Sequence, residues 1–238
     1  MPTLCYLTEC SSTNDEILHF LPEHATAITS VYTFHQTQGR GTYGNQWQSS
    51  KEENIAFSSA LPTTLFQDDD FWAMLWCTLM ARDFLSHITD EKVAIKWPND
   101  LILKQKKISG MLIEKKKVRN IHYYIFGIGI NVLQKNFDAF PHAGSLFTQT
   151  KKKLDLHTLA SDFHSFLTEK SKDILSIENL LHQYNSHLFK REKIAVFETN
   201  DIRQNGIIQM MDTNGNLIVE LEHDGLKSFY HKEIKMLY

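Results

Sequence analysis

The stretch between residues 93 and 132 restricts the fold most, because one strand-like segment follows another there with few helices between them. Val93 to Trp97 and Leu101 to Leu103 both have the composition of strands, and Pro98 between them favours a turn. Tyr123 to Val132 is a nearly continuous β-prone run. Successive strands of this kind do not make a regular βαβ series, so we predict an α+β fold with a mixed β-sheet and packed helices.

Helical spacing of apolar residues appears elsewhere in the chain. Large apolar residues between Phe71 and Phe84 recur at helical intervals, and we expect Trp72 and Trp76 among them to lie in the core. Two further helices are expected, one beginning at Asp155 and one following Ser176, with Asp155 in the N-cap position.

Beyond residue 190 the chain carries only strand signals, separated by Asn-Gly and Asp-Gly pairs that favour tight hairpin turns. Short strands joined in this way are typical of a small closed β-barrel. We therefore predict a main domain over 1–189 and a small C-terminal β-barrel over 190–238. A chain of 238 residues with 42% apolar residues can supply one sizeable core.

Composition and charge restrict the partners of such a protein. A net charge of −3 gives no electrostatic reason to expect DNA or a membrane, and no apolar run approaches the ~20 residues that span a bilayer. Cys5, Cys10 and Cys77 are too few and wrongly spaced for a disulfide framework or a zinc site. The twelve histidines form no motif for a transition metal. We expect a cytoplasmic protein.

Three glycines, Gly39, Gly41 and Gly44, surround Arg40 in a loop that leads to Trp47. Glycine lets backbone N–H groups come close to a ligand, and arginine adds a planar, permanently charged donor. Such a loop can bind a phosphate or a carboxylate. A glycine-rich surface turn explains the same residues equally well, so other segments have to decide between the two interpretations.

Several polar boxes accompany this loop at predicted strand ends and turns. They read SerSerThrAsn at 11–14, GlnThrGlnGlyArgGly at 36–41, AsnIleAlaPheSer at 54–58, LysTrpProAsnAsp at 96–100, LysIleSerGlyMetLeuIleGlu at 107–114 and GlyIleGlyIleAsnVal at 127–132. In order and spacing the set resembles the biotin protein ligase family, in its form without an N-terminal DNA-binding domain. The resemblance covers essentially the whole chain.

The resemblance implies a class II synthetase-like catalytic domain followed by an SH3-like β-barrel. It also implies an ATP-dependent enzyme that converts biotin to biotinoyl-5′-AMP, releases pyrophosphate, and transfers biotin to a lysine of a biotin carboxyl carrier domain of a carboxylase. ATP, Mg²⁺ and biotin are then the small molecules expected at the site. The protein partner is the carrier domain, no DNA partner is expected, and the chain is a monomer or a homodimer.

The site residues follow from the same resemblance. Lys107 and Arg40 are implied to be catalytic, because two anions must meet and a cation stabilises the charge that shifts between them. Biotin contacts are implied for Ser12, Thr13, Asn14, Gln36, Gly39, Arg40, Gly41, Thr42, Lys107 and Gly110. ATP contacts are implied for Arg40, Trp47, Asn99, Asp100, Lys107 and Asn131, and Asp100 is implied to reach Mg²⁺ through ATP.

Ordinary structural roles remain open for several of these residues. Ser12 and Thr13 can simply cap a helix, Trp47 can be a core residue, and Lys107 can be a solvated lysine in a basic run. Asn99 and Asp100 can form a plain turn after a proline.

The chain also departs from the family pattern within the loop. Thr42, Tyr43 and Asn45 stand where several members of the family carry arginines after GlyArgGly. Fewer cations imply a weaker grip on the adenylate, and a loop with three glycines is expected to be mobile when empty.

Three other functions compete with this interpretation. A lipoate protein ligase resembles the family in fold and in making an acyl-adenylate, although the LysTrpProAsnAsp box favours biotin. A non-catalytic protein that binds biotin or a carrier domain is the second alternative, and retention of Lys107 with Arg40 argues against it. A nucleic-acid-binding module is the third, and it would need a basic face that the net charge does not indicate.

Overall fold

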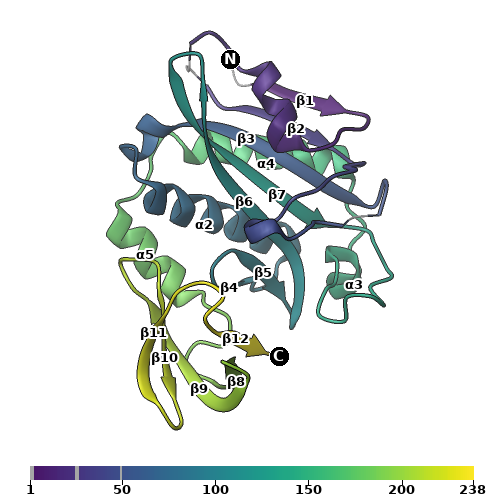
Figure 1. The fold of residues 1–238 in the computed structure, drawn as a ribbon. Helices are drawn as coiled ribbons and strands as arrows, with labels where there is room; N and C mark the ends of the chain where they lie inside the picture. The colour runs from purple at the N-terminus through teal and green to yellow at the C-terminus, as the bar shows by residue number, and fades with distance from the viewer. Residues whose placement is uncertain (1–2, 25–26, 49) are drawn as a thin grey trace.

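A computed structural model describes residues 3–24, 27–48 and 50–238, without the side chain of Tyr43 (Figure 1). Its centre is a seven-stranded sheet with the order β1-β2-β3-β7-β6-β5-β4. The strands are β1 Thr3–Leu7, β2 Thr29–Thr33, β3 Asn54–Pro62, β4 Ala94–Lys96, β5 Asp100–Leu103, β6 Lys106–Val118 and β7 Ile121–Asn131. β1 runs parallel to β2 and the other neighbours are antiparallel. The predicted mixed α+β sheet is confirmed.

Helices cover one face of this sheet, as Figure 1 shows for α2 and α4. The helices are α1 Thr13–Glu16, α2 Asp70–Thr89, α3 Leu146–Thr150, α4 Leu156–Lys170 and α5 Ile177–Ser186, and the short 3₁₀ segments are η1 Ile17–Phe20, η2 Thr42–Gly44 and η3 Thr63–Phe66. Asp155 and Ser176 cap α4 and α5, because each side chain accepts a backbone N–H bond. Both expected helices are confirmed.

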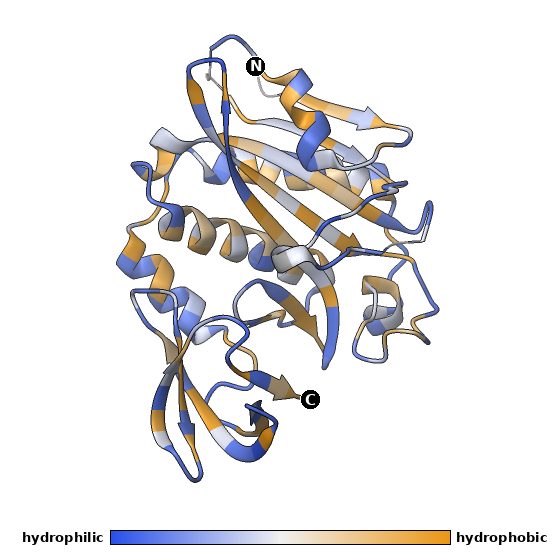
Figure 2. Ribbon diagram, viewed as in Figure 1, coloured by the Kyte–Doolittle hydropathy of each residue, from blue (hydrophilic) through white to orange (hydrophobic). Residues whose placement is uncertain are grey.

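The main core lies between the sheet and helices α2 and α4. Phe57 on β3, Phe84 on α2 and Phe163 on α4 are almost completely buried and pack ring against ring. Figure 2 shows the same layer as apolar stretches along the central strands β3 and β7. Trp76 is buried as predicted, whereas Trp72 is half-buried against the core and its indole N–H bonds the carbonyl of Leu175 at 3.0 Å.

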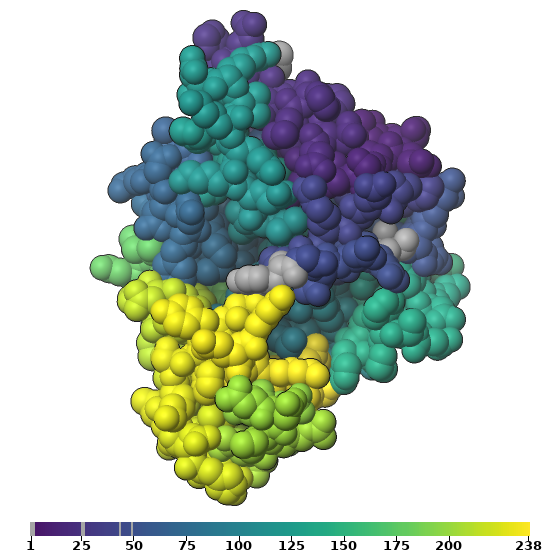
Figure 3. Space-filling model, in the orientation of Figure 1, coloured from purple at the N-terminus to yellow at the C-terminus, as the bar shows by residue number. Residues whose placement is uncertain are grey.

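A second, five-stranded antiparallel sheet forms the C-terminal part, in the order β11-β10-β9-β8-β12. Its strands are β8 Ile194–Thr199, β9 Ile202–Met211, β10 Leu217–Leu221, β11 Gly225–Phe229 and β12 Lys235–Leu237. Figure 3 shows this part packed directly against the rest of the molecule. Phe197 and Val219 belong to the same cluster of buried apolar side chains as the main sheet. The domain boundary near residue 190 therefore stays a prediction.

Among the described residues, hydrogen bonds link the C-terminal sheet to the rest of the molecule. The side-chain amide of Asn185, at the end of α5, bonds the carbonyl of Met211 at 2.9 Å and accepts its N–H at 2.6 Å. The indole N–H of Trp97 bonds the carbonyl of Gly215 at 3.0 Å. None of the helices described is long and apolar enough to cross a membrane.

Candidate active site

Glycines on two neighbouring strands form the floor of a cavity on the face of the sheet opposite the core helices. Gly110 on β6 lies opposite Gly129 on β7, and Gly127 follows two residues away on the same face. A Cβ at Gly127 would lie 2.2 Å from Oδ1 of Asn14, and one at Gly129 would lie 2.2 Å from Cε2 of Trp47. These glycines let other segments of the chain approach the sheet.

The SerSerThrAsn box forms one wall through α1. Thr13 donates its backbone N–H to Oε1 of Gln36 at 2.8 Å. The hydroxyl of Ser58 bonds the side-chain oxygens of Thr13 at 2.8 Å and of Asn14 at 2.6 Å. Ser12 occupies the N-cap position of α1, but its side chain makes no capping bond there. Helix capping thus does not account for the hydroxyl of Ser12.

The glycine-arginine loop folds over this floor as a short hairpin. Gly41 donates its N–H to the carbonyl of Asn45 at 2.7 Å, and Trp47 donates to the carbonyl of Gly39 at 2.9 Å. The indole of Trp47 then lies against Gly129, and its buried N–H has no hydrogen-bond partner among the described residues. Trp47 is therefore half-buried at the cavity rather than in the core.

Arg40 crosses the cavity and meets two carboxylates that the sequence analysis did not single out. Its terminal nitrogens bond both oxygens of Asp15 at 2.9 Å, and one of them also bonds Oε2 of Glu114 at 3.0 Å. The bonds to Asp15 are the main cause that raises the pKa of Arg40. Glu114 is the last residue of the LysIleSerGlyMetLeuIleGlu box, and Asp15 directly follows SerSerThrAsn. Their position in or next to these motifs was the signal that could have identified them.

Glu114 is hydrogen-bonded to Asn14, in the α1 wall of the cavity. Burial acts to raise its pKa, but the hydrogen bond from Nδ2 of Asn14 at 2.8 Å and the ion pairs with Lys116 and Arg40 outweigh burial and lower it. The carboxylate is therefore ionised at neutral pH and is anchored independently of Arg40.

The LysTrpProAsnAsp and LysIleSerGly boxes meet at the far end of the cavity. Lys107 on β6 forms an ion pair with Oδ1 of Asp100, at the start of β5, with a separation of 2.7 Å. Asn99 donates from Nδ2 to the carbonyl of Met111 at 2.7 Å. Lys96 is close by, and burial lowers its pKa. Lys107 is thus held at the site by a carboxylate and is not simply solvated.

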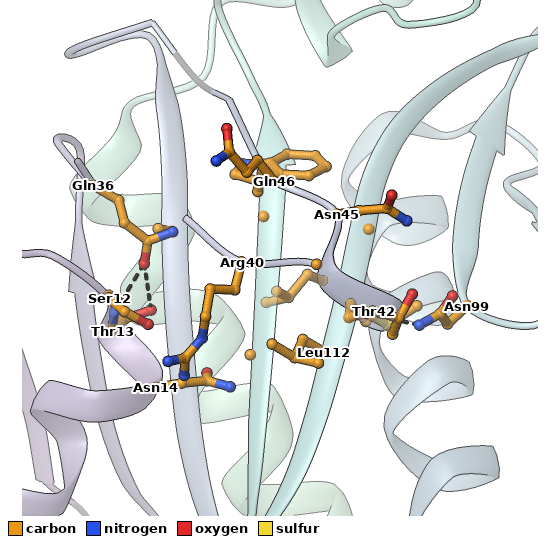
Figure 4. Close-up of a pocket in the computed structure, with 18 of the residues that line it drawn as sticks. Ser12, Thr13, Asn14, Gln36, Arg40, Thr42, Asn45, Gln46, Asn99 and Leu112 are labelled. Carbon is orange, nitrogen blue, oxygen red and sulfur yellow. Dashed lines mark hydrogen bonds between the residues drawn. The ribbon is translucent and has the colours of Figure 1, made fainter. Parts of the chain in front are cut away.

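Figure 4 shows how the cavity brings these segments together, with Gln36, Ser12 and Thr13 at one end and Thr42 and Asn99 at the other. The cavity encloses about 90 Å³. Of the residues expected at the site, those that line it are Ser12, Thr13, Asn14, Gln36, Arg40, Gly41, Thr42, Trp47, Asn99, Asp100, Lys107 and Gly110.

Two expected residues lie apart from this cavity. Gly39 lines a neighbouring cavity outside the hairpin, and a Cβ there would lie 2.4 Å from the carbonyl oxygen of Trp47. Asn131 is buried, and its amide bonds the carbonyl of Gly144 at 3.0 Å. A contact between Asn131 and a nucleotide stays a prediction. Tyr43, the other departure from the family pattern besides Thr42 and Asn45, has its side chain outside the described part.

The donor groups present do not make a self-sufficient metal site. No cluster of three or more His, Cys, Asp or Glu side chains suitable for a metal occurs among the described residues. Asp100 supplies one carboxylate at the cavity and Asn99 one amide beside it. Such a set fits Mg²⁺ carried by the phosphates of ATP, which needs only one or two protein oxygens.

The sequence model described as "Biotin/lipoate A/B protein ligase family" matches residues 7–131. The bifunctional ligase/repressor BirA of Bacillus spizizenii is 26% identical over 98% of this chain and 74% of its own length. The biotin--[acetyl-CoA-carboxylase] ligase of Mycobacterium tuberculosis is 28% identical over 54% of this chain and 46% of its own length. The match thus covers less than half of that relative.

Solved structures resemble the chain over nearly its full length. The biotin protein ligase from Aquifex aeolicus in complex with biotin and ATP has a TM-score of 0.79 at 24% identity, covering 99% of this chain and 98% of that one. The biotin acetyl coenzyme A carboxylase synthetase from Helicobacter pylori, with bound biotinylated ATP, has a TM-score of 0.62 at 19% identity, covering 95% and 100%. At these identities the structures establish the fold.

Proposed function

This chain belongs to the biotin/lipoate A/B protein ligase family, and from that premise we propose that it is an ATP-dependent biotin protein ligase. It activates biotin as biotinoyl-5′-AMP and transfers the biotinoyl group to a lysine of a biotin carboxyl carrier domain. The observation that carries the proposal is the cavity itself. Two cations, Arg40 and Lys107, lie at one glycine floor that is flanked by hydroxyl and amide groups.

The wall around α1 suits the ureido ring of biotin. Ring N–H groups need acceptors and the ring carbonyl needs donors, since an unpaired buried polar group costs about 1–3 kcal/mol. Ser12, Thr13 and Gln36 offer hydroxyl and amide groups of both kinds, and Asn14 adds a further amide. The glycine floor and Leu112 leave flat apolar surface for the thioether ring and the valeryl chain.

The first reaction joins two anions. A carboxylate oxygen of biotin attacks the α-phosphorus of ATP, the bond from that phosphorus to the bridging oxygen breaks, and pyrophosphate leaves. Lys107 and Arg40 neutralise the oxygens between which charge moves, and they hold the reactants in line. In the second reaction the carrier lysine attacks the acyl carbon, AMP departs, and the amine loses a proton.

Both cations are paired with carboxylates in the structure, so ligands must exchange partners with them. MgATP arrives with its cation bound to phosphate oxygens, and Asp100 can accept that cation. This would release Lys107 from its ion pair with Asp100. Asn99 and Thr42 line the same end of the cavity, where the nucleotide would bind.

Admission of the ligands also requires the hairpin to move. The cavity of about 90 Å³ is far smaller than the ~300–1,000 Å³ typical of ligand sites, because Trp47 and Arg40 project into it. The loop that carries them must open before biotin and ATP enter and then close over both. The loop is therefore expected for a steric reason to become ordered when its ligands bind.

We place the reaction in the cytoplasm, where the free thiols of Cys5, Cys10 and Cys77 are stable. The macromolecular partner is the carrier domain of a carboxylase, and the enzyme acts as a monomer or a homodimer. Domains 1–189 and 190–238 correspond to the catalytic unit and the appended β unit.

Release of pyrophosphate that depends on both biotin and ATP tests the proposal, with lipoate supplied in parallel. We expect release with biotin, and biotin on the target lysine once a carrier domain is added. Release with lipoate alone would identify a lipoate ligase instead. Tight biotin binding without any release would identify a non-catalytic binding protein.

A further inference from the structure

Arg40 is held across the cavity by groups from two separate segments. Asp15 lies on α1 and Glu114 lies on β6, 25 and 74 residues away from it in sequence. Asp15 receives two parallel bonds at 2.9 Å, one from each terminal nitrogen, which is the strongest arrangement between arginine and a carboxylate. Glu114 receives a second bond from one of these nitrogens at 3.0 Å.

These bonds leave Arg40 unable to take a further anion in the usual two-bond geometry. A guanidinium has five N–H donors, and the two carboxylates use three of them. The two remaining donors, on Nε and on the other terminal nitrogen, point in different directions. A carboxylate or phosphate that needs two parallel bonds must therefore displace Asp15 or Glu114.

Because Arg40 is part of the hairpin, Asp15 and Glu114 also attach the hairpin to the rest of the protein. The hairpin closes on itself through bonds between Gly41 and Asn45 and between Trp47 and Gly39. Its side-chain attachments to the rest of the protein include the ion pairs of Arg40 and the indole of Trp47 against the glycine floor. Breaking the ion pairs would release the arginine side of the hairpin.

We infer that Asp15 and Glu114 are positioning residues that latch the hairpin through Arg40 and thereby set how readily it gives way to an anionic ligand. Asp15 is the movable half of the latch, because its side chain is 45% exposed. Glu114 is the fixed half, with 22% exposure and an additional bond from Asn14. The part of the inference that concerns biotin and ATP rests on the proposed function, whereas the latch itself does not.

The latch is tested first on the full chain without any ligand. Amide hydrogen exchange is followed at residues 39–47 in the wild type, Asp15→Asn and Glu114→Gln. Asparagine keeps the shape of the side chain but removes its charge, so we expect Asp15→Asn to speed exchange by about fivefold, the upper range for a partly exposed pair. Asp90→Asn is the matched control, since Asp90 likewise forms an ion pair on the surface, with Lys152, and lies away from the cavity.

A structural role of Asp15 in α1 alone is distinguished by combining variants. In an Arg40→Ala background the latch is already absent, so Asp15→Asn should not speed exchange further. An unchanged rate in Asp15→Asn, or an equal acceleration with and without Arg40, would overturn the inference.

The ligand half is tested by the rate of biotin binding, followed by tryptophan fluorescence after rapid mixing. We expect Asp15→Asn to bind biotin about fivefold faster, and biotinol, which lacks the carboxylate, to gain less because it brings no anion to take over the bonds of Asp15 to Arg40. An unchanged association rate despite faster amide exchange would overturn this half of the inference. A wild type that binds no biotin at all would refute the proposed function and leave the exchange result standing.

Discussion

Replacing Gly129 by alanine should drive the indole of Trp47 off the floor of the cavity. The added Cβ would lie 2.2 Å from Cε2, 2.5 Å from Nε1 and 2.6 Å from Cζ2 of the indole, whereas carbon atoms pack at about 3.5–4.0 Å. The ring must therefore retreat by about 1 Å or more. Gly129 cannot yield instead, because β7 is paired on both sides, opposite Ala56 on β3 and Gly110 on β6.

The expected costs to stability and to activity differ. Overpacking would cost about 1–3 kcal/mol if the indole stayed in place. The hairpin can move, so we expect the loss to fall near the lower limit and the Tm to drop by about 2–4 °C. Activity should fall more, by about 100-fold, since a displacement of roughly 1 Å around the reacting groups is enough for that.

Thermal unfolding and biotin-dependent pyrophosphate release measure the two effects separately. In a Trp47→Ala background the clash is gone, so Gly129→Ala should cost no further stability. Gly41→Ala is the steric control, because its Cβ would meet no atom closer than 3.5 Å and the Tm should not change. An equal loss of stability from Gly129→Ala with and without the indole would refute the reasoning.

Four further outcomes are expected. Lys107→Ala should slow pyrophosphate release by about 100- to 1,000-fold, from a loss of about 2.7–4 kcal/mol of transition-state stabilisation, with unchanged circular dichroism; near-normal release would remove Lys107 from the mechanism. Biotin and ATP together should protect residues 39–46 from proteolysis and amide exchange, and full protection of the empty loop would contradict the gating. Thr42→Arg should slow dissociation of preformed biotinoyl-adenylate by about tenfold or more through a new charged contact; equal rates in a chase would show that residue 42 does not reach the phosphate. Burial holds the pKa of His164 below its ordinary value of 6.5, so the unfolded chain binds a proton that the folded chain does not, and the free energy of unfolding should decrease as pH falls below 6.5. His164→Gln should flatten this decrease in denaturant titrations, and an unaltered slope would exclude His164 as its source.

Much of the fold could be predicted because its signals are local. Asp155 and Ser176 cap helices through bonds to backbone groups three residues ahead, so a few neighbouring residues determine the outcome. The strands between residues 93 and 132 could be predicted in the same way, although β4 covers only Ala94–Lys96 and not the whole of Val93 to Trp97. The 3₁₀ segment η1 at residues 17–20 contacts β2 and β3, so its form depends instead on packing against neighbouring strands.

The site was predictable as a set of motifs but not as a set of contacts. Gly127, Gly129 and Asn131 share one face of β7 by the alternation of a strand, and the sequence suggested a ligand contact for Asn131. The chain after β7 returns to cover it, and the carbonyl of Gly144 takes its amide. Only the path of that later segment decides what Asn131 can reach.

Sequence alone was enough to propose which residue types carry the chemistry: a glycine-bracketed Arg40, a lysine in Lys107, and hydroxyl and amide groups near the N-terminus. Tertiary structure alone decided that Arg40 is paired with Asp15 and Glu114. Motifs and capping act over a few residues, where the chain's own geometry limits the possibilities. An ion pair between groups 25 and 74 residues apart exists only once strand order and register bring its members within 3 Å, and no local pattern records that distance.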